Sequence, residues 1–181
     1  MGKQFHQLSD EHTAFIARQK IYFVATAAAE GRVNLSPKGM DSLRVLGPQR
    51  VVWLNLTGSG NETAAHVALN PRMTVMFCAF EGAPLILRLY GKARLVQRGD
   101  ADWETLLAHF EPLPGTRQLF DLCIDLVQSS CGMAVPNYTY GGDRELLTEW
   151  AVQKGPDGLR RYWEERNRFS LDGFPTHIIR P

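Results

Sequence analysis

The sequence predicts a mainly β protein with peripheral helices, folded as an antiparallel β-barrel. About seven segments are rich in strand-forming residues or alternate between apolar and polar side chains. Hairpin-length turns join most of these segments, and helical periodicity is confined to short stretches between them or near the ends of the chain. Short turns require antiparallel neighbours, and the number of strands favours closure of the sheet into a barrel.

The expected strands occupy residues 21–29, 32–36, 43–46, 51–56, 73–80, 85–97 and 120–126. In the second strand, Val33 and Leu35 should face the core, while Asn34 and Ser36 face the other side. Gly91 interrupts the longest strand and predicts a bend or a β-bulge at that point.

Helical patterns are expected at residues 10–19, 60–69 and 103–110, and twice more beyond Pro136. The change of pattern after Pro136 divides the chain into two parts. Residues 1–136 form the barrel domain, and residues 137–181 form a helical C-terminal tail packed on the barrel or on a second subunit.

Composition limits the classes of function and the cellular location. The formal net charge is +1, from 20 basic and 19 acidic residues, and this balance argues against nucleic-acid or membrane-surface partners. Cys78, Cys123 and Cys131 are widely spaced, which fits neither a disulfide framework nor a paired-cysteine zinc site. The N-terminal residues lack the apolar core of a signal peptide, and no apolar run reaches about 20 residues. We therefore expect a cytoplasmic protein with no metal site.

Two loops carry residue types that suit a bound anion. The first reads Ser36-Pro37-Lys38-Gly39 and offers a hydroxyl, a cation and a glycine that permits close approach. The second reads Thr57-Gly58-Ser59-Gly60-Asn61-Glu62-Thr63 and enters a helix, whose N-terminal N–H groups and dipole favour negative charge. Alternatively, Ser59 and Glu62 form a capping box, and Lys38 is a solvated turn lysine.

Four sequence runs resemble the pyridoxamine 5'-phosphate oxidase-like family. They are residues 33–39 (VNLSPKG), 54–66 (LNLTGSGNETAAH), 70–77 (NPRMTVMF) and 86–93 (ILRLYGKA). The resemblance implies a split β-barrel, usually a homodimer, with two FMN molecules in clefts between the subunits. It places the strand of Ser36, Pro37, Lys38 and Gly39 along the flavin. It also implies that Thr57, Ser59, Asn61 and Thr63 contact phosphate or ribityl oxygens.

The chain departs from the founding oxidase at two places. Asn61-Glu62 stands where that enzyme has an Arg-Lys pair to grip phosphate, and the C-terminal residues 176–181 (THIIRP) lack its substrate motif. Oxidation of pyridoxamine phosphate itself is therefore not expected, and a deazaflavin or haem ligand remains an alternative to FMN. The leading hypothesis is an FMN-dependent oxidoreductase acting on an unidentified small molecule. The alternatives are a non-catalytic flavin-binding protein for storage, sensing or electron relay, and a barrel module without a cofactor.

Two further residues have open interpretations. Cys131 follows a strand and either lies at the cofactor cleft or is a buried residue in a tight turn. His66, on the expected helix 60–69, could face solvent or the ligand. No Ser/His/Asp set and no paired carboxylates occur at a recognisable spacing, so hydrolase mechanisms have no support.

Overall fold

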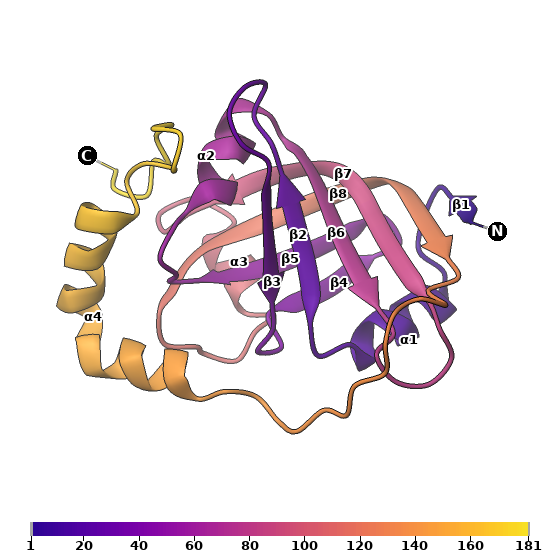
Figure 1. Cartoon of the computed structure of the whole chain (residues 1–181). Helices are drawn as coiled ribbons and strands as arrows, with labels where there is room; N and C mark the ends of the chain where they lie inside the picture. Colours follow the sequence, from indigo (N-terminus) through magenta and orange to yellow (C-terminus); the bar gives the residue numbers. More distant parts are fainter. Residues whose placement is uncertain (1, 181) are drawn as a thin grey trace.

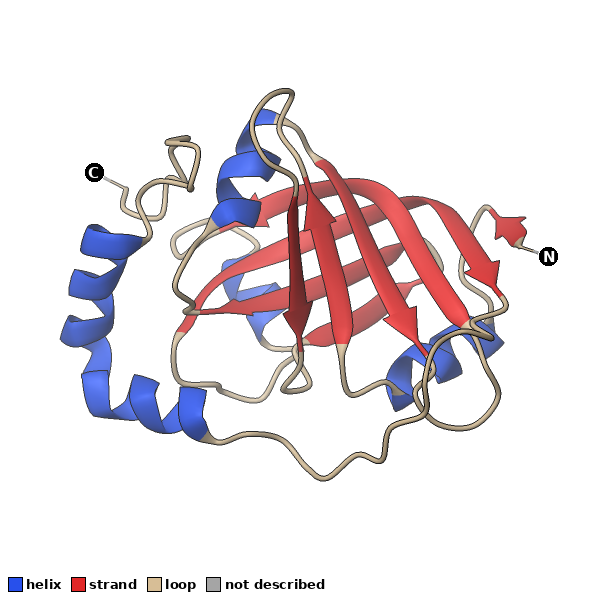
Figure 2. Cartoon of the chain, in the orientation of Figure 1, coloured by secondary structure: helices blue, strands red, loops and turns tan. Residues whose placement is uncertain are grey.

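The computed structural model describes residues 2–180 as one antiparallel sheet with helices around it (Figures 1 and 2). The strands are β1 (Lys3–Phe5), β2 (Tyr22–Thr26), β3 (Asn34–Lys38), β4 (Leu43–Gly47), β5 (Arg50–Leu56), β6 (Arg72–Cys78), β7 (Ile86–Val96) and β8 (Thr116–Ser130). The helices are α1 (Asp10–Arg18), α2 (Glu62–Leu69), α3 (Trp103–Leu107) and α4 (Leu146–Arg166). The predicted class, mainly β with peripheral helices, is confirmed.

The sheet curls but does not close. Its strand order is β3-β2-β6-β7-β8-β5-β4, and β1 pairs with the end of β8. The edge strands β3 and β4 are joined by the short connection 39–42 but share no ladder in the described chain. Full closure was therefore the wrong expectation, whereas the split barrel is confirmed. The split lies between β3 and β4, and beyond the end of the β4 ladder β3 faces the last residues of β5, with α2 nearby (Figure 1).

Two apolar clusters stabilise the sheet. The larger one fills the barrel interior and includes Val24, Val75, Leu89 and Val127, which are all at most 1% exposed. The smaller one lies between β5, β8 and α3 on the outer side of the barrel, around Trp103. Burial of this kind contributes roughly 25 cal/mol per Å² of apolar surface, so these clusters hold in place the strands that carry the site.

Strand β3 presents the face opposite to the one that we predicted. Val33 and Leu35 are 73% and 65% exposed, whereas Asn34, Ser36 and Lys38 lie on the inward face. The register explains this result, because Ser36 pairs with the fully buried Val24 across the β2–β3 ladder, and paired residues share a face. We predicted that the apolar face packs on the core because apolar side chains are usually buried. The polar face points inward instead because it lines a cavity, and the alternation along a strand does not reveal a cavity.

Gly91 marks a β-bulge, as predicted. The pairing of β7 with β8 shifts register between Tyr90 and Gly91. A Cβ atom added at Gly91 would lie 2.0 Å from the carbonyl oxygen of Cys123, which belongs to the adjacent β8 backbone. Only glycine permits this close approach of the two strands.

Helix α4 also follows the predicted pattern of two helices. Gly155 breaks the helical conformation with φ 62° and ψ 174°, and Pro156 begins the second part. This break gives α4 the bent course that carries it around one end of the barrel (Figure 2). The C-terminal segment that follows therefore returns to the neighbourhood of α2.

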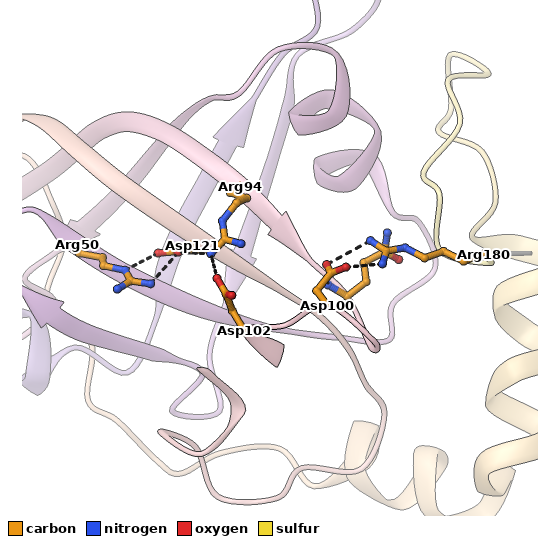
Figure 3. A network of polar contacts seen from close by, with 7 residues as sticks. Arg50, Arg94, Asp100, Asp102, Asp121 and Arg180 are labelled. Atoms are coloured by element: carbon orange, nitrogen blue, oxygen red, sulfur yellow. Dashed lines mark hydrogen bonds and ion pairs between the residues drawn. The ribbon is translucent and has the colours of Figure 1, made fainter. Parts of the chain in front are cut away.

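An ion-pair network joins β5, β7 and β8 on the outside of the barrel (Figure 3). The Asp121 carboxylate accepts from Arg50 at 2.8 and 2.9 Å and from Arg94 at 3.0 Å, and Arg94 also pairs with Asp102. Burial alone would raise the pKa of Asp121, but the hydrogen bonds from both arginines outweigh burial and lower it. The carboxylate is therefore ionised well below neutral pH, and the network remains charged there.

Candidate functional site

A cavity of about 540 Å³ opens beside the split, between β3 and the last residues of β5. This volume lies within the range of about 300–1,000 Å³ that is common for small-molecule sites. Its lining comes from β3, β5, the loop before α2, the first turn of α2, the start of β8 and the C-terminal segment. The lining residues are Asn34, Ser36, Lys38, Trp53, Asn55, Leu56, Gly58, Ser59, Gly60, Asn61, Glu62, Thr63, Arg117, Arg166, Phe169, Ser170 and Leu171.

The structure brings the two predicted loops together. Five of the nine residues predicted to bind a cofactor line this cavity, namely Ser36, Lys38, Ser59, Asn61 and Thr63. Alternation along β3 turns Pro37 to the outer face, and Gly39 lies beyond the end of that strand. The predicted role of these nine residues in binding a cofactor stays a prediction.

Thr57 is a structural link rather than a lining residue. Its hydroxyl donates to the carbonyl oxygen of Gly115 at 2.7 Å and accepts from Trp163 Nε1 at 2.9 Å. Thr57 is 1% exposed, so its side chain has little surface left to offer a ligand. The bond from Trp163 instead ties α4 to the loop at the cavity.

Cys131 lies outside the cavity within this chain. It follows Ser130 at one end of β8, whereas Arg117 lies at the other end of that strand. Cys131 is exposed, so the alternative of a buried residue in a tight turn is wrong. A hydrogen bond with the backbone of Met133 is the main cause that lowers the pKa of its thiol.

Helix α2 begins later than predicted, and the capping box is absent. Its N-cap is Asn61, and Glu62 is the first helical residue. Ser59 therefore lies too far upstream to cap the helix with Glu62 at the third position. The Glu62 carboxylate instead accepts from the backbone N–H of Leu171 at 2.9 and 3.1 Å. This contact holds the C-terminal segment at the cavity. It also gives the Glu62 carboxylate a hydrogen-bond donor within the chain.

The side chain of Asn61 has unused hydrogen-bonding capacity. Asn61 is 2% exposed, and neither Oδ1 nor Nδ2 has a hydrogen-bond partner among residues 2–180. An unpaired buried amide costs about 1–3 kcal/mol. Such a group at a cavity wall and at the N-terminus of a helix is well placed to bind a ligand.

Arg117 is the main cation of the site, and the sequence pattern did not predict it. It is 6% exposed. Its Nη1 donates to Asn167 Oδ1 at 2.7 Å, and its Nη2 donates to the carbonyl oxygen of Gly60 at 2.8 Å. With the Asn55 amide oriented to satisfy its neighbours, Asn55 Oδ1 accepts from Arg117 Nε at 3.2 Å. Of the five N–H donors of a guanidinium, about two remain for a ligand.

Arg117 and Lys38 form an uncompensated pair of positive charges. Neither forms an ion pair with any carboxylate in the described part of the chain. Burial lowers the pKa of Arg117 to about 9. Burial and then the charge of Arg117 lower the pKa of Lys38 to about 8. Lys38 Nζ lies 4.9 Å from the centre of the Trp53 ring, so Lys38 is no solvated turn lysine.

These contacts make the cavity suitable for an anion with an attached ring system. Arg117 and the unpaired Asn61 amide lie beside the N-terminus of α2, where backbone N–H groups also favour negative charge. Lys38 adds a second cation without a counter-charge to the lining of the same cavity. Trp53 supplies an apolar aromatic surface in the same cavity.

Among residues 2–180, no group of three or more His, Cys, Asp or Glu side chains could hold a metal ion. The same residues include no helix with the length and apolarity needed to cross a membrane.

The sequence carried little signal for the remaining lining residues. Arg117 lies before the strand that we predicted, which began at residue 120, because Thr116 to Gln118 do not alternate with apolar residues. Phe169, Ser170 and Leu171 follow α4 in a segment without periodicity. Only the folded chain brings them to this cavity, where Leu171 contacts Glu62, 109 positions earlier.

Comparisons with known proteins agree with this architecture. A family model described as pyridoxamine 5'-phosphate oxidase matches residues 8–131. The pyridoxamine 5'-phosphate oxidase family protein ustO of Aspergillus flavus is 34% identical over 191 positions, which cover 94% of this chain and 76% of ustO.

Solved structures share the fold at lower sequence identity. HupZ of Group A Streptococcus has a TM-score of 0.53 at 19% identity, covering 66% of this chain and 91% of HupZ. A pyridoxinephosphate oxidase family protein of Clostridium acetobutylicum has a TM-score of 0.51 at 16% identity, covering 72% and 91%. An FAD binding protein of Mycobacterium smegmatis has a TM-score of 0.50 at 14% identity, covering 70% and 97%. The family match and the fold together show that this chain belongs to the pyridoxamine 5'-phosphate oxidase family.

Proposed function

We propose that this chain binds FMN in the cavity between β3 and β5 and acts as an oxidoreductase on a small molecule. The observation that carries the proposal is the pairing of two uncompensated cations, Arg117 and Lys38, with the unpaired amide of Asn61. A phosphate group would neutralise Arg117 and satisfy the amide at the same time, and Lys38 would add positive charge beside the rest of the ligand. Membership of the family supports a flavin as the molecule that carries this phosphate.

The lining residues divide by chemistry into two groups. Arg117, Asn61 and Ser59 would hold the phosphate, and Lys38 and Trp53 line the part of the cavity that remains for the ring. When bound, FMN supplies hydride and electron transfer. The chain binds and orients the cofactor, and its C-terminal segment covers the cavity from Phe169 to Leu171. Cation placement beside the ring also tunes the energy of its charged forms.

Titration of the purified protein with FMN tests the proposal, with riboflavin as the matched ligand that lacks the phosphate. FMN should bind at least about 100-fold more tightly than riboflavin, because the phosphate makes several charge-assisted hydrogen bonds. Equal affinity for the two would remove the assignment of the phosphate site. Stopped-flow mixing with NADH or NADPH then tests the activity. A protein that binds FMN but is never reduced would be a flavin carrier rather than an enzyme.

The affinity for FMN should fall as pH rises through about 8. The pKa of Lys38 in the unliganded chain is about 8, so its charge is present below that pH and is lost above it. The phosphate of FMN stays dianionic above about pH 7, so it does not contribute to the change. Titrations between about pH 7 and 10 would measure it.

Two variants identify the group that causes this change. Lys38→Met should bind FMN about 10- to 100-fold more weakly at neutral pH and should lose the fall near pH 8. Lys92→Met removes an exposed lysine of β7 and should behave like the wild type. A pH-independent affinity of the wild type would contradict the role of Lys38.

We also propose that the protein works as a homodimer. The outer face of β3, β2, β6, β7 and β8 carries no helix (Figure 1). One row across it consists of Leu35, Ala25, Thr74, Tyr90 and Leu126, which pair in register. The row is mostly apolar, and an uncovered sheet face that carries apolar side chains is typical of an interface between subunits.

The mass in solution, measured by light scattering, tests this assembly. The wild type should have the mass of two chains. Leu35→Glu, which places a charge on the exposed edge of the row, should lower the mass to that of one chain at micromolar concentration. A control variant, Leu69→Glu, alters another exposed leucine on α2 and should leave the dimer intact. A monomeric wild type would refute the proposal.

A cytoplasmic location remains our expectation from the sequence.

A further inference from the structure

His66 is a buried histidine beside the cavity. It lies on α2, is 1% exposed, and its Nδ1 is 3.2 Å from the hydroxyl of Thr26 at the end of β2. Its Nε2 has no hydrogen-bond partner among residues 2–180. A fully buried imidazole with a single polar contact is unusual for a purely structural side chain.

A chain of polar side chains leads from His66 to the cavity wall. The amide Nδ2 of Asn34 donates to Thr26 Oγ1 at 3.5 Å and to Thr63 Oγ1 at 3.2 Å. The fold dictates this grouping, since Thr26 and Asn34 pair across the β2–β3 ladder and Thr63 and His66 lie one turn apart on α2. Asn34 and Thr63 both line the cavity, whereas His66 and Thr26 lie behind it.

The two hydrogen bonds of Asn34 set the direction of the chain at both threonines. An amide nitrogen has two hydrogens and accepts none, so Asn34 donates to both threonines. Each threonine oxygen accepts from Asn34, so each hydroxyl hydrogen is available for another acceptor. Thr26 can donate its hydrogen to His66 Nδ1 when the ring proton is on Nε2. For Thr63 the hydrogen is then available to an acceptor inside the cavity.

We propose that His66 is a positioning residue that fixes the Thr63 hydroxyl as a donor to the anionic group of the ligand. The imidazole acts through Thr26 and Asn34 and does not touch the ligand. Its Nδ1 accepts the Thr26 hydrogen, so the ring proton is on Nε2. This inference rests on the proposed anion site. In that site, His66 would make the Thr63 hydroxyl favour ligand groups that accept a hydrogen bond.

A double-mutant cycle on the whole protein tests the coupling, with inorganic phosphate and FMN as the ligands. Thr63→Val removes the donor and should weaken the binding of both ligands about tenfold. His66→Phe removes the acceptor at the far end and should weaken binding less, by about threefold. The double variant should bind no more weakly than Thr63→Val alone, because His66 acts only through that hydroxyl.

Additive losses in the cycle would overturn the proposal, since they would mean that His66 affects binding by another route. His66→Asn places an amide oxygen near the position of Nδ1 and should restore the wild-type affinity. If His66→Phe does not fold, Thr26→Val breaks the chain at the next link and should show the same lack of additivity. His109→Phe, at an exposed histidine, is the matched control and should change nothing.

Nitrogen NMR of the imidazole provides a readout that does not depend on a ligand. His66 should show a protonated Nε2 and an unprotonated Nδ1 near neutral pH, and a proton on Nδ1 would refute the direction of the chain. The experiments separate this inference from the proposed function. A wild type that binds neither phosphate nor FMN refutes both, whereas normal binding with an additive cycle refutes only the role of His66.

Discussion

Replacing Arg117 with methionine should reduce the affinity for FMN to about that for riboflavin. The guanidinium is the only fully buried cation of the described cavity lining, and it has N–H donors left for a phosphate. Removing one partner of a buried, hydrogen-bonded charge pair, here the guanidinium and the phosphate, costs about 2–5 kcal/mol of binding free energy. Titration calorimetry with both ligands would measure the loss, and riboflavin affinity should stay the same.

The folded state of the Arg117→Met variant should survive without ligand. Burial lowers the pKa of Arg117, which means that its charge is costly in the folded chain. Methionine would remove this cost but leave Asn167 and the carbonyl oxygen of Gly60 without their donor, so the two effects oppose each other. Arg98→Met, at an exposed arginine outside this cavity, is the control. Unchanged FMN affinity in Arg117→Met would rule out this arginine as the phosphate ligand.

Gly91→Ala should destabilise the protein by at least about 3 kcal/mol, or prevent folding. The added methyl group would lie 2.0 Å from the Cys123 carbonyl oxygen and 3.0 Å from Ile124 Cα. Both atoms belong to the backbone of β8, which cannot move without breaking its pairing with β7. Urea unfolding followed by circular dichroism would give the change in free energy.

A second glycine serves as the control for this measurement. A Cβ atom added at Gly47 of β4 would meet nothing within 4 Å, so Gly47→Ala should change stability only slightly. If Gly91→Ala unfolds at the same urea concentration as Gly47→Ala, β7 and β8 can move apart at the bulge to make room for the methyl group. That result would mean that the close approach is not needed for the fold.

Local chemistry made much of the fold predictable. Turn residues and alternation were enough for the central strands, and Gly91 indicated the bulge because only glycine tolerates such an approach. The loop before α2 was predicted as an anion site from its glycines and hydroxyls, and it does line the cavity. The orientation of β3 was not predictable, because the polar face of that strand points to a hollow and not to solvent.

The charge of the site depends on tertiary structure. The sequence has Asn61-Glu62 in place of an Arg-Lys pair that would bind phosphate, and no basic side chain occupies these two positions. Arg117 supplies the charge from a distant strand, and its partners Gly60 and Asn167 are 57 and 50 positions away. No pattern of neighbouring residues reveals such a contact. Strand periodicity also fails at Thr116 to Gln118, where buried side chains are polar.

The contacts of Asn167 have a consequence for the order of events during synthesis. Its side chain donates to the carbonyl oxygen of Gly58, 109 positions earlier, while holding Arg117 in place. Domains begin to fold from their N-terminal part as they leave the ribosome. The barrel strands can therefore assemble on the nascent chain, but the anion site is complete only after α4 has emerged. Cofactor loading should accordingly follow translation of this segment and not accompany it.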